Sequence, residues 1–198
     1  MVCVVGQIPG STRSVGILAG AFNPPTLAHQ ALVAAASRAV DHVVCILPKE
    51  YPHKSFSGAT LDERVFMLAA LGNTVAIADQ GLFIDIAREF RRDIAPAVEL
   101  HFICGRDAAE RIVSWEYGHA APPIGEQLRE YKLLVARRGG DYHVPLSLGD
   151  GVSALDVEAD WDAVSSTCVR AWIADGDPRW RSLIPAAIAD EVARIYAK

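Results

Sequence analysis

A short stretch near the N-terminus combines a turn with two side chains that can contact phosphate. Residues 16–29 read Gly-Ile-Leu-Ala-Gly-Ala-Phe-Asn-Pro-Pro-Thr-Leu-Ala-His, so an apolar run gives way to a turn and then to a helix start. Such a turn places unpaired backbone N–H groups and the positive end of the helix dipole at one point, where an anion can bind. Thr26 and His29 would share one face of the first helical turn. We therefore expect residues 16–29 to bind phosphate groups.

A second candidate phosphate-binding segment lies near the C-terminus, at residues 164–170 (Val-Ser-Ser-Thr-Cys-Val-Arg). Ser165, Ser166 and Thr167 are good N-cap residues, and their hydroxyl and N–H groups can bind phosphate oxygens. Arg170 would add a permanently charged, planar guanidinium near the same helix end. Taken alone, this segment is better explained as an ordinary capped helix with a surface arginine.

Together, the two segments resemble signature motifs of the nucleotidyltransferase superfamily, whose members join a nucleoside triphosphate to a phosphorylated partner. Residues 16–29 are similar to its G-x-F-x-P-x-(H/T)-x-G-H motif, although Ala28 replaces the glycine before the last histidine. Residues 165–170 are similar to its S-S/T-x-x-R motif and follow in the expected chain order. The resemblance implies a triphosphate site built from Gly20, Ala21, Phe22, Thr26, His29, Ser165, Ser166, Thr167 and Arg170.

A third segment narrows the resemblance to the nicotinate mononucleotide adenylyltransferases within that superfamily. Residues 47–54 resemble the P-x-x-x-P-x-K element of that family, which implies that Lys54 brings a positive charge to a substrate or triphosphate oxygen. The residues after it match the family's R-x-x-M-L helix, beginning at Arg64. For Lys49, His53 and Arg64, a solvated surface position explains the residue type equally well.

The acceptor side of the same family is recognisable farther along the chain. Residues 100–108 are similar to a strand that ends in G-x-D, and Trp115 stands at the family's tryptophan position. The resemblance implies that Gly105 lets a nucleotide approach the backbone, that Asp107 binds ribose hydroxyls and that Trp115 stacks on the pyridine ring of the acceptor. Packing in the core is the alternative for Trp115.

Two segments depart from the family pattern. Residues 132–139 are similar to a strand that ends V-x-R-P-G, but Arg138 replaces the proline; the resemblance implies a phosphate contact for Arg137. At residues 81–85 the family usually carries polar groups near the pyridine carboxylate, whereas this chain has the apolar run Leu82–Ile84. The second departure leaves the identity of the acceptor open.

Composition limits the possible classes of protein. The chain has 198 residues, 51% of them hydrophobic, which is enough for one domain over residues 1–198, with a possible helical subdomain at 165–198. The formal net charge of −5 provides no basic field, so we expect no nucleic-acid partner and no anionic membrane partner. No apolar run approaches the length of a membrane span, and the N-terminus lacks a leader pattern, so we expect a cytoplasmic protein. The scattered cysteines predict neither a disulfide framework nor a zinc site.

The elements that must position these residues follow from hydrophobic periodicity. Short apolar, β-branched runs alternate with segments of helical period, which is the pattern of a parallel sheet covered by helices on both faces. We predict an α/β fold with a Rossmann-like doubly wound parallel sheet; the resemblance adds the nucleotidyltransferase (HIGH-type) fold with a small C-terminal helical portion. The predicted strands are 14–19, 42–47, 74–78, 99–104, 132–136 and 154–157. The predicted helices are 27–40, 61–71, 82–92, 108–114, 166–174 and 185–197.

The function implied is adenylyl transfer from ATP to nicotinate or nicotinamide mononucleotide in NAD biosynthesis, with Mg²⁺ arriving on ATP and no dedicated metal ligands. One alternative is another phosphorylated acceptor, such as pantetheine phosphate or a sugar or choline-type phosphate, with ATP or CTP as donor. A second alternative is a nucleotide-binding protein without catalytic activity. The expected partners are therefore small phosphorylated molecules, together with a possible second copy of the chain.

Overall fold

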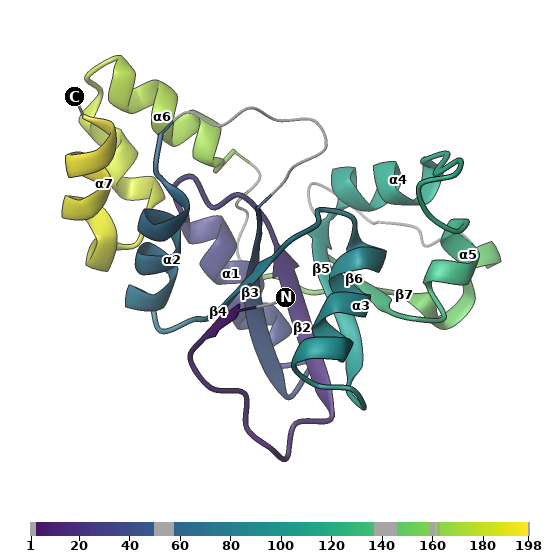
Figure 1. Ribbon diagram of the computed structural model, residues 1–198. Helices are drawn as coiled ribbons and strands as arrows, with labels where there is room; N and C mark the ends of the chain where they lie inside the picture. The colour runs from purple at the N-terminus through teal and green to yellow at the C-terminus, as the bar shows by residue number, and fades with distance from the viewer. Residues whose placement is uncertain (1–2, 50–57, 137–145, 159–160, 162, 198) are drawn as a thin grey trace.

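A seven-stranded sheet forms the centre of the computed structural model, which describes residues 3–49, 58–136, 146–158, 161 and 163–197 (Figure 1). The strands are β1 (Cys3–Val5), β2 (Ser14–Ala19), β3 (His42–Pro48), β4 (Thr74–Ala78), β5 (Glu99–Gly105), β6 (Lys132–Ala136) and β7 (Val152–Leu155). Their order in the sheet is β1-β4-β3-β2-β5-β6-β7, and every pairing is parallel except the antiparallel pairing of β1 with β4. The predicted doubly wound α/β fold is confirmed.

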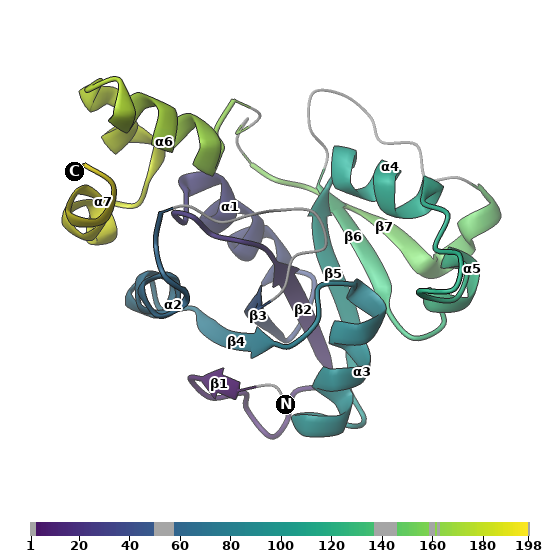
Figure 2. The ribbon, with the colours of Figure 1, turned by 45° about the horizontal axis from the view of Figure 1, so that its top comes forward.

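The helices lie on both faces of this sheet and at one end of it. They are α1 (Leu27–Ala36), α2 (Leu61–Ala70), α3 (Phe83–Asp93), α4 (Arg106–Ser114), α5 (Ile124–Gln127), α6 (Ser166–Ala174) and α7 (Ala189–Tyr196), with 3-10 turns η1 (Leu146–Gly151), η2 (Pro178–Leu183) and η3 (Ala186–Ile188). Figure 2 shows α6 and α7 beyond α1 and α2, on the side of the molecule away from α3, α4 and α5.

Alternate residues of each central strand face opposite layers of the core. Ile17, Val44 and Phe102 lie side by side on neighbouring strands and belong to the cluster that packs under α3 and α4. Leu18 and Cys45, one residue further along, belong to the cluster under α1 and α2. Both faces of the sheet are therefore buried, which explains why the strands are continuous apolar runs in the sequence.

Two cysteines take part in this core as small apolar side chains. Cys45 on β3 and Cys104 on β5 are 1% and 6% exposed. Burial raises the pKa of each thiol to about 12, so both stay protonated near neutral pH.

The C-terminal elements pack on α2 rather than on the sheet. A separate cluster joins Met67 of α2 to Val169 of α6, Trp180 of η2 and Val192 of α7, all of them buried. This packing brings the end of the chain next to the loop that follows β2, where Tyr196 contacts Asn23. No helix of the described part of the chain is long and apolar enough to cross a membrane.

The structure differs from the predicted elements mainly at their ends. β1 is an additional edge strand of 3 residues, too short to show a period in the sequence. β7 begins at Val152, two positions before the predicted strand. α1 ends at Ala36, four positions before the predicted end, because Arg38 and Ala39 donate to oxygens three residues back and tighten the chain into turns. The predicted last helix is divided between η3 and α7.

Candidate active site

The first phosphate-binding candidate forms the β2–α1 loop (residues 20–26), at the carboxyl end of the central strand. β2 lies between β3 and β5, so the chain order reverses at this strand, and in open α/β sheets this reversal marks the edge where ligands bind. Phe22 has a φ of 48°, in the left-handed region that side chains rarely adopt. Its side chain is 1% exposed and packs against the ring of His29, with centroids 5.0 Å apart.

Thr26 and His29 contact each other at the start of α1, as their spacing predicts. Thr26 is the N-cap residue and is completely buried. Its backbone N–H donates to Nδ1 of His29 at 3.0 Å, and its Oγ1 lies 2.8 Å from the same nitrogen. Because Nδ1 accepts a hydrogen bond, the proton of the neutral imidazole is on Nε2. The contact therefore fixes the orientation of the half-buried ring and places its proton on Nε2.

The second candidate segment meets this loop in space. Ser166 Oγ donates to the backbone oxygen of Pro24 at 2.7 Å. Arg170 Nη1 donates to the backbone oxygen of Asn23, and its Nη2 lies 3.3 Å from Oγ1 of Thr167. Segments more than 140 positions apart in the sequence are thus joined at one loop.

The start of α6 follows the predicted capping pattern. Ser165 is the N-cap residue, and its Oγ accepts the backbone N–H of Cys168 at 3.1 Å. Ser165 and Thr167 are exposed, whereas Ser166 and Arg170 are half-buried against the β2–α1 loop. The helix end therefore presents hydroxyl groups, with one guanidinium beside them.

Arg64 also holds the β2–α1 loop, so a solvated surface position is wrong for this residue. It is only 6% exposed. Its Nη1 donates to the backbone oxygen of Ala21 at 3.0 Å and its Nε to that of Thr60 at 3.2 Å. The sequence could not separate this buried role from an exposed one, because the position of α2 decides it.

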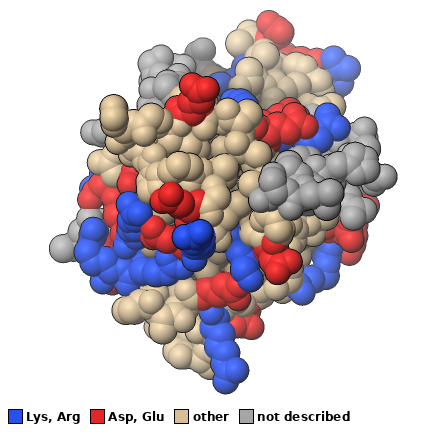
Figure 3. All heavy atoms as spheres, turned by 90° about the vertical axis from the view of Figure 1, so that its right-hand side faces the viewer, with Lys and Arg blue, Asp and Glu red and all other residues tan. Residues whose placement is uncertain are grey.

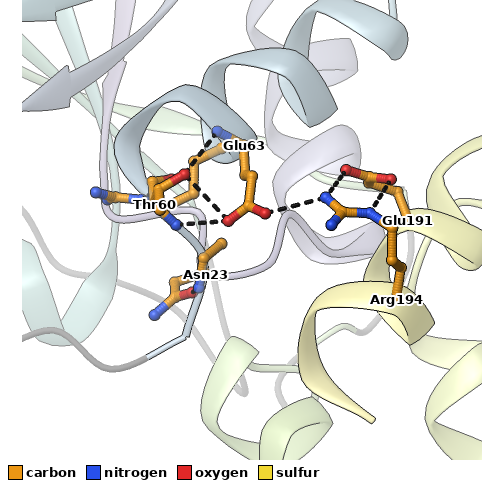
Figure 4. Close-up of polar contacts among 7 residues, drawn as sticks. Asn23, Thr60, Glu63, Glu191 and Arg194 are labelled. Carbon is orange, nitrogen blue, oxygen red and sulfur yellow. Dashed lines mark hydrogen bonds and ion pairs between the residues drawn. The ribbon is translucent and has the colours of Figure 1, made fainter. Parts of the chain in front are cut away.

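The N-terminus of α2 carries a polar network that extends to the C-terminal helix (Figure 4). Thr60 and Glu63 form a capping box, in which the carboxylate of Glu63 accepts the backbone N–H of Thr60 at 2.8 Å. The other carboxylate oxygen of Glu63 accepts from Arg194 of α7 at 3.0 Å, and Arg194 also pairs with Glu191 at 2.6 Å. The Thr60 N–H and Arg194 hold the pKa of Glu63 below its ordinary value.

One contact of the β2–α1 loop, made by Tyr196, could not be predicted from the sequence. The hydroxyl of Tyr196, near the end of α7, donates to Oδ1 of Asn23, and the backbone N–H of Ala59 donates to the same oxygen at 3.2 Å. Asn23 is 4% exposed. Helical periodicity places Tyr196 one turn after Val192, but nothing in the sequence indicates which distant residue it contacts.

The acceptor-side candidates lie on β5 and α4, beside the β2–α1 loop in the sheet order. Gly105 ends β5 and is the N-cap residue of α4, and Asp107 is exposed in the first turn of that helix. Trp115 is the C-cap residue of α4 and is 50% exposed, so core packing is wrong for this side chain. Because β5 pairs with β2, Gly105 and Gly20 lie at the carboxyl ends of adjacent strands.

The apolar segment that departs from the family pattern belongs to the core at the start of α3. Phe83 stacks on Phe102 of β5, with ring centroids 4.2 Å apart, and Ile84 is 1% exposed. Asp85 is half-buried next to them, and burial raises the pKa of its carboxyl group although Arg88 partly offsets this. This segment therefore contributes packing and one carboxyl group rather than a row of polar side chains.

Two site candidates, Lys54 and Arg137, lie outside the described residues, as does His53. Lys49 is half-exposed and forms an ion pair with Asp79 at 2.6 Å, which lowers the pKa of that carboxyl group to about 2. Among the residues that the structure describes, no group of three or more His, Cys, Asp or Glu side chains could hold a metal ion.

Acidic and basic side chains are interspersed over the face that carries α4 and α5 (Figure 3). Arg88 pairs with Glu130 at 2.6 Å, and Arg106 lies 3.7 Å from Glu110. The charges of this surface thus offset each other locally.

Comparison with known proteins extends these observations. A sequence model of the cytidylyltransferase-like family matches residues 17–172, which include both phosphate-binding candidates. The chain is 28% identical to a probable nicotinate-nucleotide adenylyltransferase of Stenotrophomonas maltophilia, over 88% of this chain and 91% of that protein. It is 32% identical to a protein of the same description from Kineococcus radiotolerans, over 89% of this chain and 87% of that protein.

Solved structures show the same fold. The nicotinic acid mononucleotide adenylyltransferase of Plasmodium falciparum, complexed with NaAD, superposes with a TM-score of 0.68 at 15% identity, over 92% of this chain and 95% of that one. The resemblance found in the signature segments is thus confirmed along most of the sequence. The chain belongs to the cytidylyltransferase-like family and is a nucleotidyltransferase.

Proposed function

We propose that this enzyme transfers AMP from ATP to nicotinate mononucleotide, releasing pyrophosphate and forming the dinucleotide precursor of NAD. The observation that carries the proposal is the meeting of His29 and Arg170 at one loop, the β2–α1 loop. The relatives described as nicotinate-nucleotide adenylyltransferases support this choice of acceptor over nicotinamide mononucleotide.

In the proposed reaction, the phosphate of the acceptor replaces pyrophosphate at the α-phosphorus of ATP. An oxygen of the acceptor's phosphate attacks that phosphorus, the bond to the oxygen bridging to the β-phosphate breaks, and pyrophosphate leaves with the electron pair. No covalent intermediate with the enzyme is needed. Such a transfer depends on positioning and on neutralising charge, which helix ends and cationic side chains supply.

His29 is the residue that we assign to the reacting phosphates. Its Nδ1 accepts from Thr26, which fixes the ring orientation, and we assign its Nε2–H as the donor to the α-phosphate or to the leaving pyrophosphate. Gly20 and the Ala21–Phe22 backbone would cradle the triphosphate at the start of α1. The predicted phosphate contact of Thr26 does not fit its complete burial, so its role is to orient His29.

The β- and γ-phosphates would lie against the N-terminus of α6. Ser165, Ser166 and Thr167 offer hydroxyl groups there, and Arg170 is positively charged beside them. Mg²⁺ would enter with ATP as part of the substrate, with phosphate oxygens and water as its ligands. Lys54 and Arg137 remain proposed phosphate contacts.

The acceptor nucleotide would lie over the ends of β5 and α4. The half-exposed indole of Trp115 has the accessible flat face that stacking on a pyridine ring requires. Asp107 is exposed and can accept hydrogen bonds from ribose hydroxyls, and Gly105 has no side chain to hinder the approach of the nucleotide.

One observation favours a second candidate, namely another phosphorylated acceptor. The apolar Leu82–Ile84 segment, with Phe83 stacked on Phe102, offers few polar groups for a pyridine carboxylate. A coupled pyrophosphate assay with ATP or CTP tests both candidates against a panel of nicotinate and nicotinamide mononucleotides, pantetheine phosphate and sugar and choline phosphates. We expect the highest kcat/KM with ATP and nicotinate mononucleotide. A higher kcat/KM with any other pair would overturn the proposal.

A further inference from the structure

We propose that the C-terminal helix α7 positions the β2–α1 loop for catalysis, with Tyr196 as the positioning residue. This inference deepens the proposed function, because it concerns the loop to which that function assigns the triphosphate. It requires a nucleotidyl transfer at the loop but does not depend on which acceptor is used.

The contact that carries the proposal joins the end of the chain to the middle of the loop. The hydroxyl of Tyr196 donates to Oδ1 of Asn23, 173 positions earlier in the sequence. The fit around this contact is close, because a Cβ on Gly58 would lie 2.8 Å from Cε1 of Tyr196 and 2.9 Å from Oδ1 of Asn23. Gly58 also has a φ of 110°, so both space and backbone require glycine there.

Asn23 is next to the strained residue of the loop. Phe22 has a left-handed backbone, and such a conformation persists only where the surrounding contacts determine it. Asn23 takes part in several of these contacts, since Arg170 donates to its backbone oxygen and both Tyr196 and the Ala59 N–H donate to Oδ1 of its side chain. Removing the Tyr196 hydroxyl would take away the side-chain hydrogen bond that ties the residue after Phe22 to α7.

A second connection reaches the other side of Phe22. Arg194 of α7 binds Glu63, which caps α2 (Figure 4). The next residue of α2, Arg64, donates to the backbone oxygen of Ala21. The C-terminal helix is therefore linked to the residues on both sides of Phe22, by one direct and one indirect contact.

These links matter because the ring of Phe22 lies against His29. A shift in the backbone of residues 21–23 would move the ring that packs against the imidazole, and small errors in placing a catalytic group cost large factors in rate. Burial raises the pKa of Tyr196 to about 12, so its hydroxyl stays protonated and can donate throughout the neutral range.

The test compares Tyr196→Phe with Val192→Ala. The first variant removes only the hydroxyl group. The second removes two buried methyl groups from the same helix, at a side chain that is 0% exposed in the C-terminal cluster. Both are compared with wild type for kcat, KM for ATP and Tm, at 25 °C and with the acceptor that gives wild type its highest kcat/KM.

We expect Tyr196→Phe to lower kcat by about tenfold or more, with a Tm only about 2–4 °C lower. Val192→Ala should lower Tm by more but leave kcat within about twofold of wild type, since it removes none of the hydrogen bonds to Asn23. An unchanged kcat in Tyr196→Phe would overturn the proposal. Equal losses of kcat in both variants would also overturn it, because the effect would then be one of stability.

Hydrogen exchange gives a measurement that needs no acceptor. The backbone amides of residues 20–23 and 26 should exchange faster in Tyr196→Phe than in wild type, and at the wild-type rate in Val192→Ala. If wild type prefers another acceptor, the proposed function fails, yet the kcat ratio and the exchange rates still decide the role of Tyr196. Unchanged exchange in Tyr196→Phe would contradict the proposed positioning even if kcat fell.

Discussion

Replacing His29 by asparagine and by glutamine separates the two nitrogens of its ring. Nδ1 accepts the backbone N–H of Thr26 at 3.0 Å, whereas Nε2 carries the proton that we assign to the phosphates. The amide oxygen of asparagine can occupy the position of Nδ1, and the amide nitrogen of glutamine can reach that of Nε2. Each variant therefore keeps one function of the ring and loses the other.

The expected magnitudes follow from these contacts. Removing one preorganised donor from a transition state costs about 10²–10³ in kcat. Removing the acceptor that caps the Thr26 N–H costs about 1 kcal/mol of folding stability, or about 2–4 °C in Tm for a chain of this size. His29→Asn should thus keep the wild-type cap but lose about 10²–10³ in kcat, whereas His29→Gln should lose stability and keep more of the rate.

The assay is pyrophosphate release under saturating ATP and acceptor, with Tm measured on the same samples. His29→Ala is the reference, because it lacks both functions and, like the other two variants, loses the ring packed against Phe22. Near-normal turnover in His29→Asn would refute the assignment of Nε2 as a donor. Equal kcat values for the glutamine and alanine variants would refute it as well.

Three further outcomes are expected. Arg64→Met should lower the free energy of unfolding in urea by about 3 kcal/mol, because it removes two charge-assisted hydrogen bonds made by a buried guanidinium, whereas the exposed control Arg88→Met should cost less than about 1 kcal/mol; equal costs would contradict the burial argument. Lys49→Gln should raise the pKa of Asp79 from about 2 towards its ordinary 3.8. Since the pKa of Asp79 is lower in the folded than in the unfolded protein, the ion pair stabilises the fold at pH values above 3.8, and this contribution is lost as the pH falls towards 2. NMR titration of the Asp79 carboxyl carbon measures its pKa in both proteins. An unchanged pKa in Lys49→Gln would show that Lys49 does not cause the lowering. Trp115→Ala should weaken binding of nicotinate mononucleotide about tenfold in calorimetry with little change in Tm, because the side chain is half-exposed; unaltered affinity would remove it from the acceptor site.

The central sheet could be predicted from the sequence because most of its strands are recognisable from their own residues. The strand at residues 14–19 was predicted with the bounds of β2, as were β4, β6 and α6, since each is a run of apolar residues of one period bounded by turn residues. β1 was missed because 3 residues show no period, and its place depends on the free edge of β4.

The residue types and spacing within each of the two phosphate-binding candidates also sufficed to predict their local contacts. The spacing of Thr26 and His29 alone predicts that they share a helical turn, and Ser165 before α6 has the residue type of an N-cap. A resemblance of motifs predicted that the two segments act together, and the structure joins them through Ser166 and Arg170.

What only the tertiary structure decided is which distant atoms hold the loop. From the sequence alone, Arg64 could be exposed and Tyr196 has no identifiable partner. The packing of α2 and α7 around Met67 and Val192 brings both side chains to the loop. Sequence periodicity tells which face of a helix is apolar, but not against which neighbour that face rests or which polar atoms then come within 3 Å. Those contacts arise from the packing of whole elements, so residues 21–23 owe part of their geometry to side chains from α2 and α7 whose contacts no local pattern identifies.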